Sequence, residues 1–278
     1  MVSQIVRISG TLIKRASYLL FLIVNLKIFD EITELKKKIL FSNEDFMETA
    51  KGNPLVSVIV PTRNDAENLS SLLLTIQRQS FRNTEVIVAD YKSTDGTPEI
   101  AKNFGAKVLN ITKKGIGHAS HMAALHSKGQ IIIRTDADTF FPKWIISRVV
   151  NVFNTFPHVM LVHGGHIYVD AGFFMNFLAH LYDKYWKPLW GTRGIFIATR
   201  RSAYFSVGGF SNILYGEDFH LGRKFYMGYG KNSIYYDPTN IIVVTSVRGI
   251  KANSFMRYIL EGKTYTTLRE MATPKEFQ

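Results

Sequence analysis

Two aspartates, Asp136 and Asp138, stand two positions apart at the end of the apolar segment "IIIRTDADTF" (131–140). Like charges this close repel each other, so the arrangement becomes favourable when a cation lies between them. Carboxylate oxygens are hard ligands that suit Mg²⁺ or Mn²⁺. The alternative interpretation is a solvated turn after a strand, in which one of these carboxylates caps a helix that begins near Pro142. The pair therefore marks a candidate metal site.

A second carboxylate pair, Glu217 and Asp218, begins the helix-like segment "EDFHLGRKFYM" (217–227). Carboxylates can remove a proton from a hydroxyl group during its attack, and this is one interpretation of the pair. Acidic residues in a first helical turn also stabilise the helix through its dipole. The two interpretations are compatible.

The segments around these carboxylates alternate between strand and helix patterns from Leu55 onward. Short apolar runs predict buried strands, and leucines at helical spacing predict the helices between them. The predicted strands are 55–60, 84–90, 106–111 and 130–136, and the predicted helices are 66–79, 97–104 and 117–129, with Thr97 as N-cap and Gly129 closing the third helix. Strands separated by helices of this length predict an α/β fold with a mostly parallel sheet and helices on both faces.

Polar clusters follow three of the predicted strands, and such strand ends meet at one edge of a parallel sheet. The clusters are "PTRND" (61–65), "DYKSTDGT" (90–97) and "DADTF" (136–140). Ligands of open α/β sheets bind beyond the carboxyl ends of the strands. The three clusters are therefore expected to lie side by side and to form one site.

The composition of the 278-residue chain is that of a globular protein, with 46% hydrophobic and 20% charged residues. No cysteine is present, which excludes disulfides, thiolate zinc sites and cysteine nucleophiles. The formal net charge of +12 favours acidic partners such as nucleotide phosphates or anionic lipid. The sequence has no zinc-finger, zipper or RNP signature, so nucleic acid is not expected as a partner.

Residues 1–50 differ from the alternating part and are predicted to form an N-terminal helical segment. The apolar run Ala16–Leu26 is flanked by Lys14, Arg15 and Lys27. Its 11 residues would reach about 17 Å as a helix, too short for a hydrocarbon core of roughly 30 Å. A helix in the membrane interface and a helix packed on protein both remain open. The expected location is cytoplasmic, with peripheral contact to the cytoplasmic membrane face as the membrane-bound alternative.

Five segments, in this order and spacing, resemble the family-two glycosyltransferases, which have the GT-A fold. They are "VSVIVPTRNDAENLSSLLLTIQRQ" (56–79), "EVIVADYKSTDGT" (85–97), "IIIRTDADTF" (131–140), "GIFIATRRSAYFSVGGF" (194–210) and "YGEDFHLGRKFYMGYG" (215–230). The resemblance implies a GT-A-like (Rossmann-like) catalytic domain over residues 51–250, followed by a helical tail over 251–278. It also implies a metal-dependent, inverting transfer of sugar from a nucleotide-sugar, UDP- or GDP-linked, to an acceptor hydroxyl.

The resemblance assigns donor and metal roles to residues at the strand ends. Asp138 is expected to bind the metal directly, and Asp136 the metal through water or the ribose of the donor. Asp90 is expected to accept a hydrogen bond from the base. The other residues expected on the donor side are Pro61, Thr62, Arg63, Asp95 and Gly115. Asp95 lies in the Asp-Gly turn "STDGT", so a role in the turn alone is the alternative.

Residues nearer the C-terminus are expected on the acceptor side. By its place in the "ED" motif, Asp218 is expected to be the base, with Glu217 supporting the acceptor or the loop. Arg200, Arg201 and Trp190 are expected near the acceptor. The apolar stretch 172–190 is expected in the core or, alternatively, as a wall for a lipid-linked acceptor. A glycan is the other acceptor class.

One departure from the family pattern and one match to another motif keep other functions open. Tyr91 and Lys92 stand where the family usually has aspartate and glycine, which leaves a non-catalytic sugar-nucleotide-binding module as one alternative. The other alternative is a phosphatase of the haloacid-dehalogenase type, because "DADT" also matches its D-x-D-x-T motif with Asp136 as nucleophile. That motif usually opens its domain, whereas here three strand-helix units precede it.

Overall fold

The computed structural model describes residues 53–246 except 172, 188, 190, 214 and 215. The predicted N-terminal segment, the C-terminal tail and Trp190 lie outside the described residues. None of the described helices combines the length and the hydropathy that crossing a bilayer requires.

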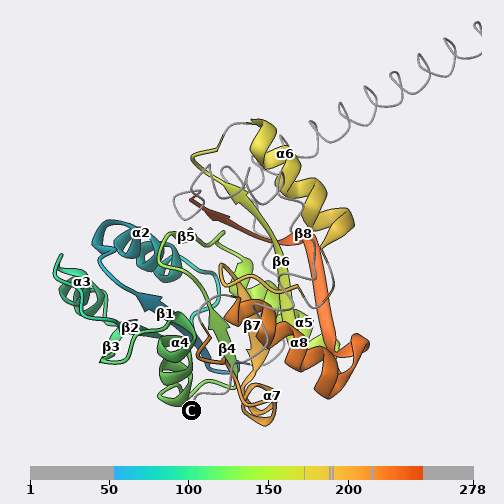
Figure 1. Ribbon diagram of the computed structural model, residues 1–278, viewed down its shortest axis with the longest axis horizontal. Coiled ribbons are helices and arrows are strands. Elements are labelled where there is room, and N and C mark those ends of the chain that lie inside the picture. Colours follow the sequence, from blue (N-terminus) through green and yellow to red (C-terminus); the bar gives the residue numbers. More distant parts are fainter. Residues whose placement is uncertain (1–52, 172, 188, 190, 214–215, 247–278) are drawn as a thin grey trace, which may run out of the picture. The chain divides into compact units, whose positions relative to one another are not determined.

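Eight strands form one mixed sheet in the order β3-β2-β1-β4-β7-β6-β8-β5 (Figure 1). The strands are β1 (Val56–Thr62), β2 (Thr84–Asp90), β3 (Lys107–Asn110), β4 (Ile131–Arg134), β5 (Thr139–Phe140), β6 (Leu161–Tyr168), β7 (Ile197–Arg200) and β8 (Ile234–Thr245). The first four strands along the chain pair in parallel, and β7 runs antiparallel to both β4 and β6. The predicted α/β class with a mostly parallel sheet is confirmed.

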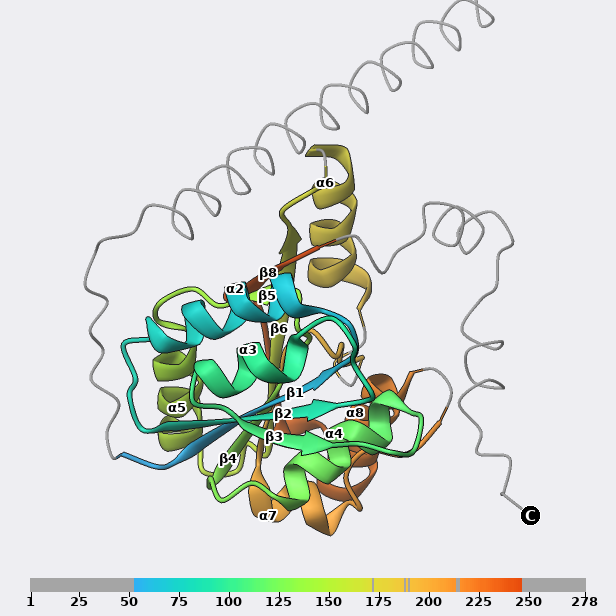
Figure 2. The same ribbon diagram turned by 90° about the vertical axis from the view of Figure 1, so that its left-hand side faces the viewer.

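Helices cover both faces of the sheet (Figure 2). They are α2 (Ala66–Gln77), α3 (Thr97–Asn103), α4 (Ile116–Leu125), α5 (Ile145–Thr155), α6 (Phe173–Leu181), the π-helix η1 (Tyr182–Trp186), α7 (Arg201–Ser206), α8 (Glu217–Tyr229) and the short 3-10 helix η2 (Lys231–Ser233). Figure 2 shows α2 and α3 on one side of β1, β2 and β3, with α4 on the other side.

Two apolar cores explain this layering, because successive side chains of a strand point to opposite faces. Along β1, Val58 and Val60 belong to one core with residues of α2, α3 and α5. Ile59 belongs to the other core with residues of α4, α7 and α8. Because both faces are covered, β1 is buried along its whole length, which is why it reads as a continuous apolar run.

Several predicted helix boundaries differ from the observed ones, and two of the differences concern a residue predicted to begin or end a helix. The helix predicted to run from 117 to Gly129 ends at Leu125, and the backbone amide of Gly129 instead donates to the Ser57 hydroxyl at 2.8 Å. The N-cap of α3 is Gly96, with φ of 84°, and Thr97 is already the first helical residue. Glycine adopts this left-handed backbone without strain, so Gly96 occupies the cap position. The cap therefore lies one residue earlier than predicted.

Candidate functional site

A buried arginine at the end of β4 joins the two carboxylate pairs. Arg134 is 2% exposed, and its Nη2 lies 3.0 Å from Oδ1 of Asp136 and 3.6 Å from Oε1 of Glu217. A buried guanidinium group is stable only when it is paired, so both carboxylates contribute to holding it. The sequence-based reasoning missed Arg134; the signal was a charged residue directly after three isoleucines.

Glu217 is the first residue of α8 and is 8% exposed. Burial and the neighbouring charge of Asp218 raise the pKa of Glu217 to about 7, although Arg134 opposes the shift. A carboxyl group with a pKa near neutrality can both take and give a proton at physiological pH. Glu217 and Asp218 also stand in the first turn of α8, as the helix-dipole interpretation expects.

The carboxylate of Asp218 is held by the segment before β7. The amide of Gly194 donates to Oδ2 of Asp218 at 2.6 Å, and the hydroxyl of Thr192 donates to the main-chain oxygen of Asp218. The amide of Phe219 donates to Oδ1 at 2.7 Å. We call residues Thr192–Gly194 the strap. A Cβ atom at Gly194 would lie 1.6 Å from Nη1 of Arg134, so a side chain here would push this arginine out of its paired position.

The start of α4 packs against the loop that leads into α8. A Cβ atom at Gly117 would lie 2.1 Å from the backbone oxygen of Ser211 and 3.2 Å from Cβ of Glu217. At Gly115, the N-cap of α4, it would lie 2.1 Å from Oδ1 of Asn212. These close approaches explain why glycines occur here, and a donor role for Gly115 stays a prediction.

The ends of β1 and β2 bring the expected nucleoside side together. Thr62 and Asp90 are partners in the parallel pairing of these strands. Asp90 is 3% exposed, and it accepts hydrogen bonds from the amide and the hydroxyl of Ser93. The exposed Arg63 lies with its guanidinium carbon 5.2 Å from the ring centre of Tyr91. Pro61 completes this end of β1 as a buried residue.

Asp95 links the starts of α2 and α3 through its hydrogen bonds. Its Oδ2 accepts from the amide of Ala66 at 3.1 Å, and its Oδ1 accepts from the amide and hydroxyl of Thr97. The bond from the Thr97 hydroxyl is the main cause that lowers the pKa of Asp95. With both oxygens bound, Asp95 fits the turn interpretation, and its predicted donor contact gains no geometric support.

Asp136 and Asp138 lie half-buried between β4 and β5. Helix α5 begins only at Ile145 and has no side-chain cap, so neither aspartate caps it as the alternative interpretation required. No group of three His, Asp or Glu side chains among the described residues could by itself hold a metal ion. Two carboxylates nevertheless fit Mg²⁺ or Mn²⁺ in nucleotide sites, where substrate phosphates and water complete the ligand set.

Arg200 and Arg201 lie at the other end of β4 from Asp136. In the antiparallel pairing Arg200 is opposite Ile131, whereas Ile197 is opposite Arg134. Arg200 donates to the carbonyl oxygens of Val159 and Phe153 at 2.8 and 2.6 Å and thereby caps the end of α5. The structure places Arg200 in a packing and capping role, and the acceptor-side role of both arginines stays a prediction.

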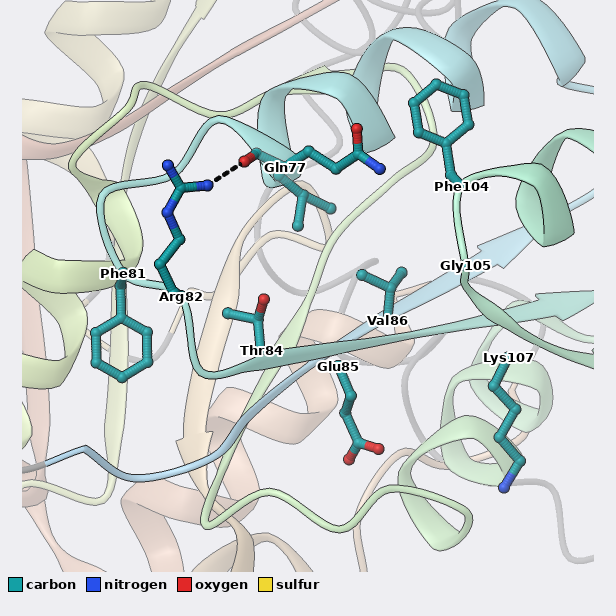
Figure 3. A pocket seen from close by; sticks show the side chains of 10 residues that line it. Gln77, Phe81, Arg82, Thr84, Glu85, Val86, Phe104, Gly105 and Lys107 are labelled. Carbon is teal, nitrogen blue, oxygen red and sulfur yellow. Dashed lines mark hydrogen bonds between the residues drawn. The ribbon is translucent and has the colours of Figure 1, made fainter.

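A groove of about 470 Å³ lies at the opposite, amino end of β2 and β3 (Figure 3). Gln77, Arg82, Glu85, Phe104 and Lys107 are among the residues that line it, and Arg82 donates to the carbonyl oxygen of Gln77 at 2.6 Å. Because it is remote from the strand ends that carry Asp90 and Asp136, it is not part of the candidate site.

The comparison with protein families gives a match that covers more than half of the chain. Residues 57–213 match the family described as Glycosyl transferase family 2. The match includes β1, β2 and β4 with the polar residues that follow them. It favours the transferase interpretation of "DADT" over the phosphatase alternative.

Solved and curated relatives agree with this match. The mannosyltransferase PcManGT from Pyrobaculum calidifontis, solved in complex with GDP-Man and Mn²⁺, is 25% identical, with a TM-score of 0.61 over 84% of this chain and 70% of that one. A 4,4'-diaponeurosporenoate glycosyltransferase of Staphylococcus haemolyticus is 40% identical over 90 residues, which are 30% of this chain and 24% of the relative. A dolichyl-phosphate hexose transferase of Haloferax volcanii is 30% identical over 99 residues, 36% of this chain and 43% of the relative. The chain thus spans less than half of the length of these two curated relatives.

Proposed function

Because the chain belongs to glycosyl transferase family 2, we propose that it transfers a sugar from a UDP- or GDP-linked donor to an acceptor hydroxyl, with inversion at the sugar carbon. That it is a glycosyltransferase enzyme with a GT-A-like fold follows from the family and its solved relatives. The nucleotide-sugar class is supported by the relative from P. calidifontis, which was solved with GDP-Man.

One observation carries the assignment of the site. The guanidinium group of Arg134 bridges Asp136, on the donor side, to Glu217, on the acceptor side. These carboxylates come from the end of β4 and the start of α8. The reacting atoms of donor and acceptor must be held about 3–3.5 Å apart for transfer to occur, so the residues that bind donor and acceptor have to converge in this way.

A divalent metal ion is part of the proposal. Asp138 would bind it directly, and Asp136 would bind it through water or hold the ribose of the donor. Such an ion neutralises the negative charge that develops on the departing diphosphate. The Mn²⁺ in the P. calidifontis relative supports a divalent ion, and Mg²⁺ is the other candidate.

Asp218 is proposed as the base. The acceptor oxygen forms its bond to the sugar carbon while the bond from that carbon to the diphosphate oxygen breaks, and the hydroxyl proton passes to the carboxylate of Asp218. The strap fixes this carboxylate through Gly194. Glu217, buried beside Arg134, supports the loop, and its pKa of about 7 makes it the one competing base to test.

The acceptor is proposed to be a lipid-linked group or a glycan. The name of the H. volcanii relative, a dolichyl-phosphate hexose transferase, supports the lipid class. The basic flanks of the run Ala16–Leu26 suit anionic headgroups, which supports peripheral contact with the cytoplasmic membrane face.

The test compares two amide substitutions in a transfer assay with a panel of UDP- and GDP-sugars and Mn²⁺. Asp218→Asn is expected to lower kcat by about 10²-fold or more, with the donor Kd unchanged by calorimetry, because only the proton acceptor is lost. Glu217→Gln is expected to keep most of the turnover. If Asp218→Asn turned over at the wild-type rate while Glu217→Gln did not, Glu217 would be the base. If the wild-type protein transferred or hydrolysed none of the donors, the proposed function would be wrong.

A further inference from the structure

A second cluster of ionisable side chains lies between β6, η1 and the strap, and the proposed reaction does not use it. At its centre Asp183 is 1% exposed. Its Oδ2 lies 2.8 Å from Nδ1 of His166, and its Oδ1 lies 3.8 Å from Nζ of Lys187 and 3.7 Å from Nη2 of Arg193. We call these four residues the Asp183 cluster.

The imidazole of His166 lies between the carboxylate of Asp183 and the guanidinium group of Arg193. Nη1 of Arg193 lies 2.8 Å from Nε2 and 3.1 Å from Nδ1 of His166, and Nδ1 lies 2.8 Å from Oδ2 of Asp183. Burial, together with the charge of Arg193, lowers the pKa of His166 to about 4, so the ring is neutral at physiological pH. A neutral ring with its proton on Nδ1 turns a donor toward Asp183 and leaves Nε2 as an acceptor beside Arg193.

Asp183 remains ionised within this cluster. Although its burial opposes ionisation, the hydrogen bond from His166 and the charge of Arg193 hold the pKa of Asp183 well below its usual range. A buried carboxylate costs several kcal/mol unless it is paired, and removing one partner leaves an uncompensated charge. The position of Arg193 is therefore tied strongly to that of Asp183.

Arg193 is the middle residue of the strap. On one side of it Thr192 binds the main chain of Asp218, and on the other side Gly194 binds the carboxylate of Asp218. The strap itself belongs to no helix or strand, so no regular ladder of backbone hydrogen bonds fixes its course. The side chain of Arg193 also lies 5.1 Å from the ring centre of Tyr182, the first residue of η1.

We propose that Asp183 is a positioning residue for Asp218, acting through His166 and Arg193 on the strap. The cluster anchors Arg193, Arg193 fixes the strap, and the strap orients the carboxylate through the amide of Gly194. The effect of this positioning on turnover rests on the proposed role of Asp218 as base. Asp183 in η1 and Lys187 at its C-cap are four residues apart, a spacing that brings both side chains to the same side.

The test uses the full-length protein with two acid-to-amide variants, Asp183→Asn and Glu85→Gln. Glu85 is the matched control, because its Oε1 accepts from Ser57 and from the amides of Lys128 and Gly129 at the other end of the sheet. Both variants are first compared with wild type by thermal unfolding. The readouts are hydrogen exchange of the Gly194 amide by NMR, kcat, and the KM for the donor.

We expect Asp183→Asn to speed exchange of the Gly194 amide and to lower kcat by about 10- to 100-fold, with the donor KM changed less than about threefold. Glu85→Gln should leave the exchange of the Gly194 amide, kcat and the donor KM unchanged. Arg193→Lys keeps the charge but loses the planar fork, so it should give the same pattern and serves as the second variant if Asp183→Asn does not fold.

Unchanged exchange of the Gly194 amide in Asp183→Asn or Arg193→Lys would overturn the anchoring of the strap. Faster exchange with wild-type kcat would overturn the role in positioning Asp218. If the wild-type protein transfers no sugar, the proposed function fails on its own, and the exchange measurement still decides whether the cluster holds the strap.

Discussion

At the scale of single residues, the protein keeps several charges out of water near Asp218. Lys187 is one of them: its Nζ donates to the carbonyl oxygen of Gly164 at 3.2 Å and lies 4.9 Å from the ring centre of Tyr236. Burial lowers the pKa of Lys187 to about 7, and the charge of Asp183 offsets only part of that shift. Folding therefore disfavours the charged form of Lys187 at neutral pH.

This shift makes stability depend on pH in a defined direction. The folded pKa of about 7 is below the ordinary 10.5, so between these values the unfolded chain binds a proton that the folded chain lacks. The free energy of unfolding should then rise with pH in this window, by up to about 1.4 kcal/mol per pH unit. In Lys187→Met this contribution disappears.

Urea unfolding of wild type and Lys187→Met at pH 6, 7, 8 and 9 measures the contribution of Lys187 to the free energy of unfolding. Relative to the variant, wild type should gain stability from pH 7 upward and show a constant difference below. Lys128→Met, which removes an exposed lysine, is the control. A wild-type-to-variant difference that stays flat up to pH 9 would contradict the depressed pKa.

At the scale of elements, close backbone contacts fix where α4 and α8 begin relative to each other. Gly117 lies at the start of α4 against the backbone of Ser211, beside the side chain of Glu217. A backbone oxygen cannot move aside as a flexible side chain can. The distance between the starts of α4 and α8 therefore depends on the absence of a side chain at Gly117.

Gly117→Ala should lower the free energy of unfolding by about 1–3 kcal/mol, because the new Cβ would lie 2.1 Å from the Ser211 oxygen. It should also lower kcat, since Glu217 and Asp218 must shift with α8. Gly228→Ala is the matched control within a helix: its Cβ would meet only the end of the Val207 side chain at 3.3 Å, and alanine gains up to about 1 kcal/mol in helix propensity. Denaturant unfolding gives the free energy of unfolding of both variants, and a transfer assay gives their kcat. Equal stability of the two variants would refute the packing explanation.

At the scale of the whole molecule, the sheet gathers residues from distant parts of the chain at one edge. Thr62 and Asp90 follow from the pairing of β1 with β2, and Asp136 follows from the pairing of β1 with β4. The unfolded chain has no such gathering. A ligand that needs all of these segments therefore binds the folded state alone and stabilises it.

A nucleotide-sugar with Mn²⁺ should accordingly raise the melting temperature. At a ligand concentration 100 times its Kd the gain is about 2.7 kcal/mol, which corresponds to roughly 5–10 °C for a domain of this size. Thermal unfolding with UDP- and GDP-sugars, with Mn²⁺ or with EDTA, measures the gain. Asp138→Ala should lose the part that depends on metal, and Glu85→Gln should keep it. An equal gain in EDTA would argue against a metal-dependent donor site.

The sequence by itself determined the strand and helix alternation, the fold class and the carboxylates at the strand ends. Hydrophobic spacing is a local property, so β2 was predicted with its observed bounds, Thr84–Asp90. Resemblance in five ordered segments was enough to predict the family, which the match over residues 57–213 confirmed.

Only the tertiary structure decided which side chains meet. Arg134 reaches Glu217 because β4 ends beside the start of α8. The strap reaches Asp218 because it leads into β7, which pairs with β4. The direction of β7, antiparallel to β4, puts Arg200 opposite Ile131, at the other end of β4 from Asp136. Strand direction and the partners of buried charges depend on contacts between distant segments, and no local spacing of residues encodes them.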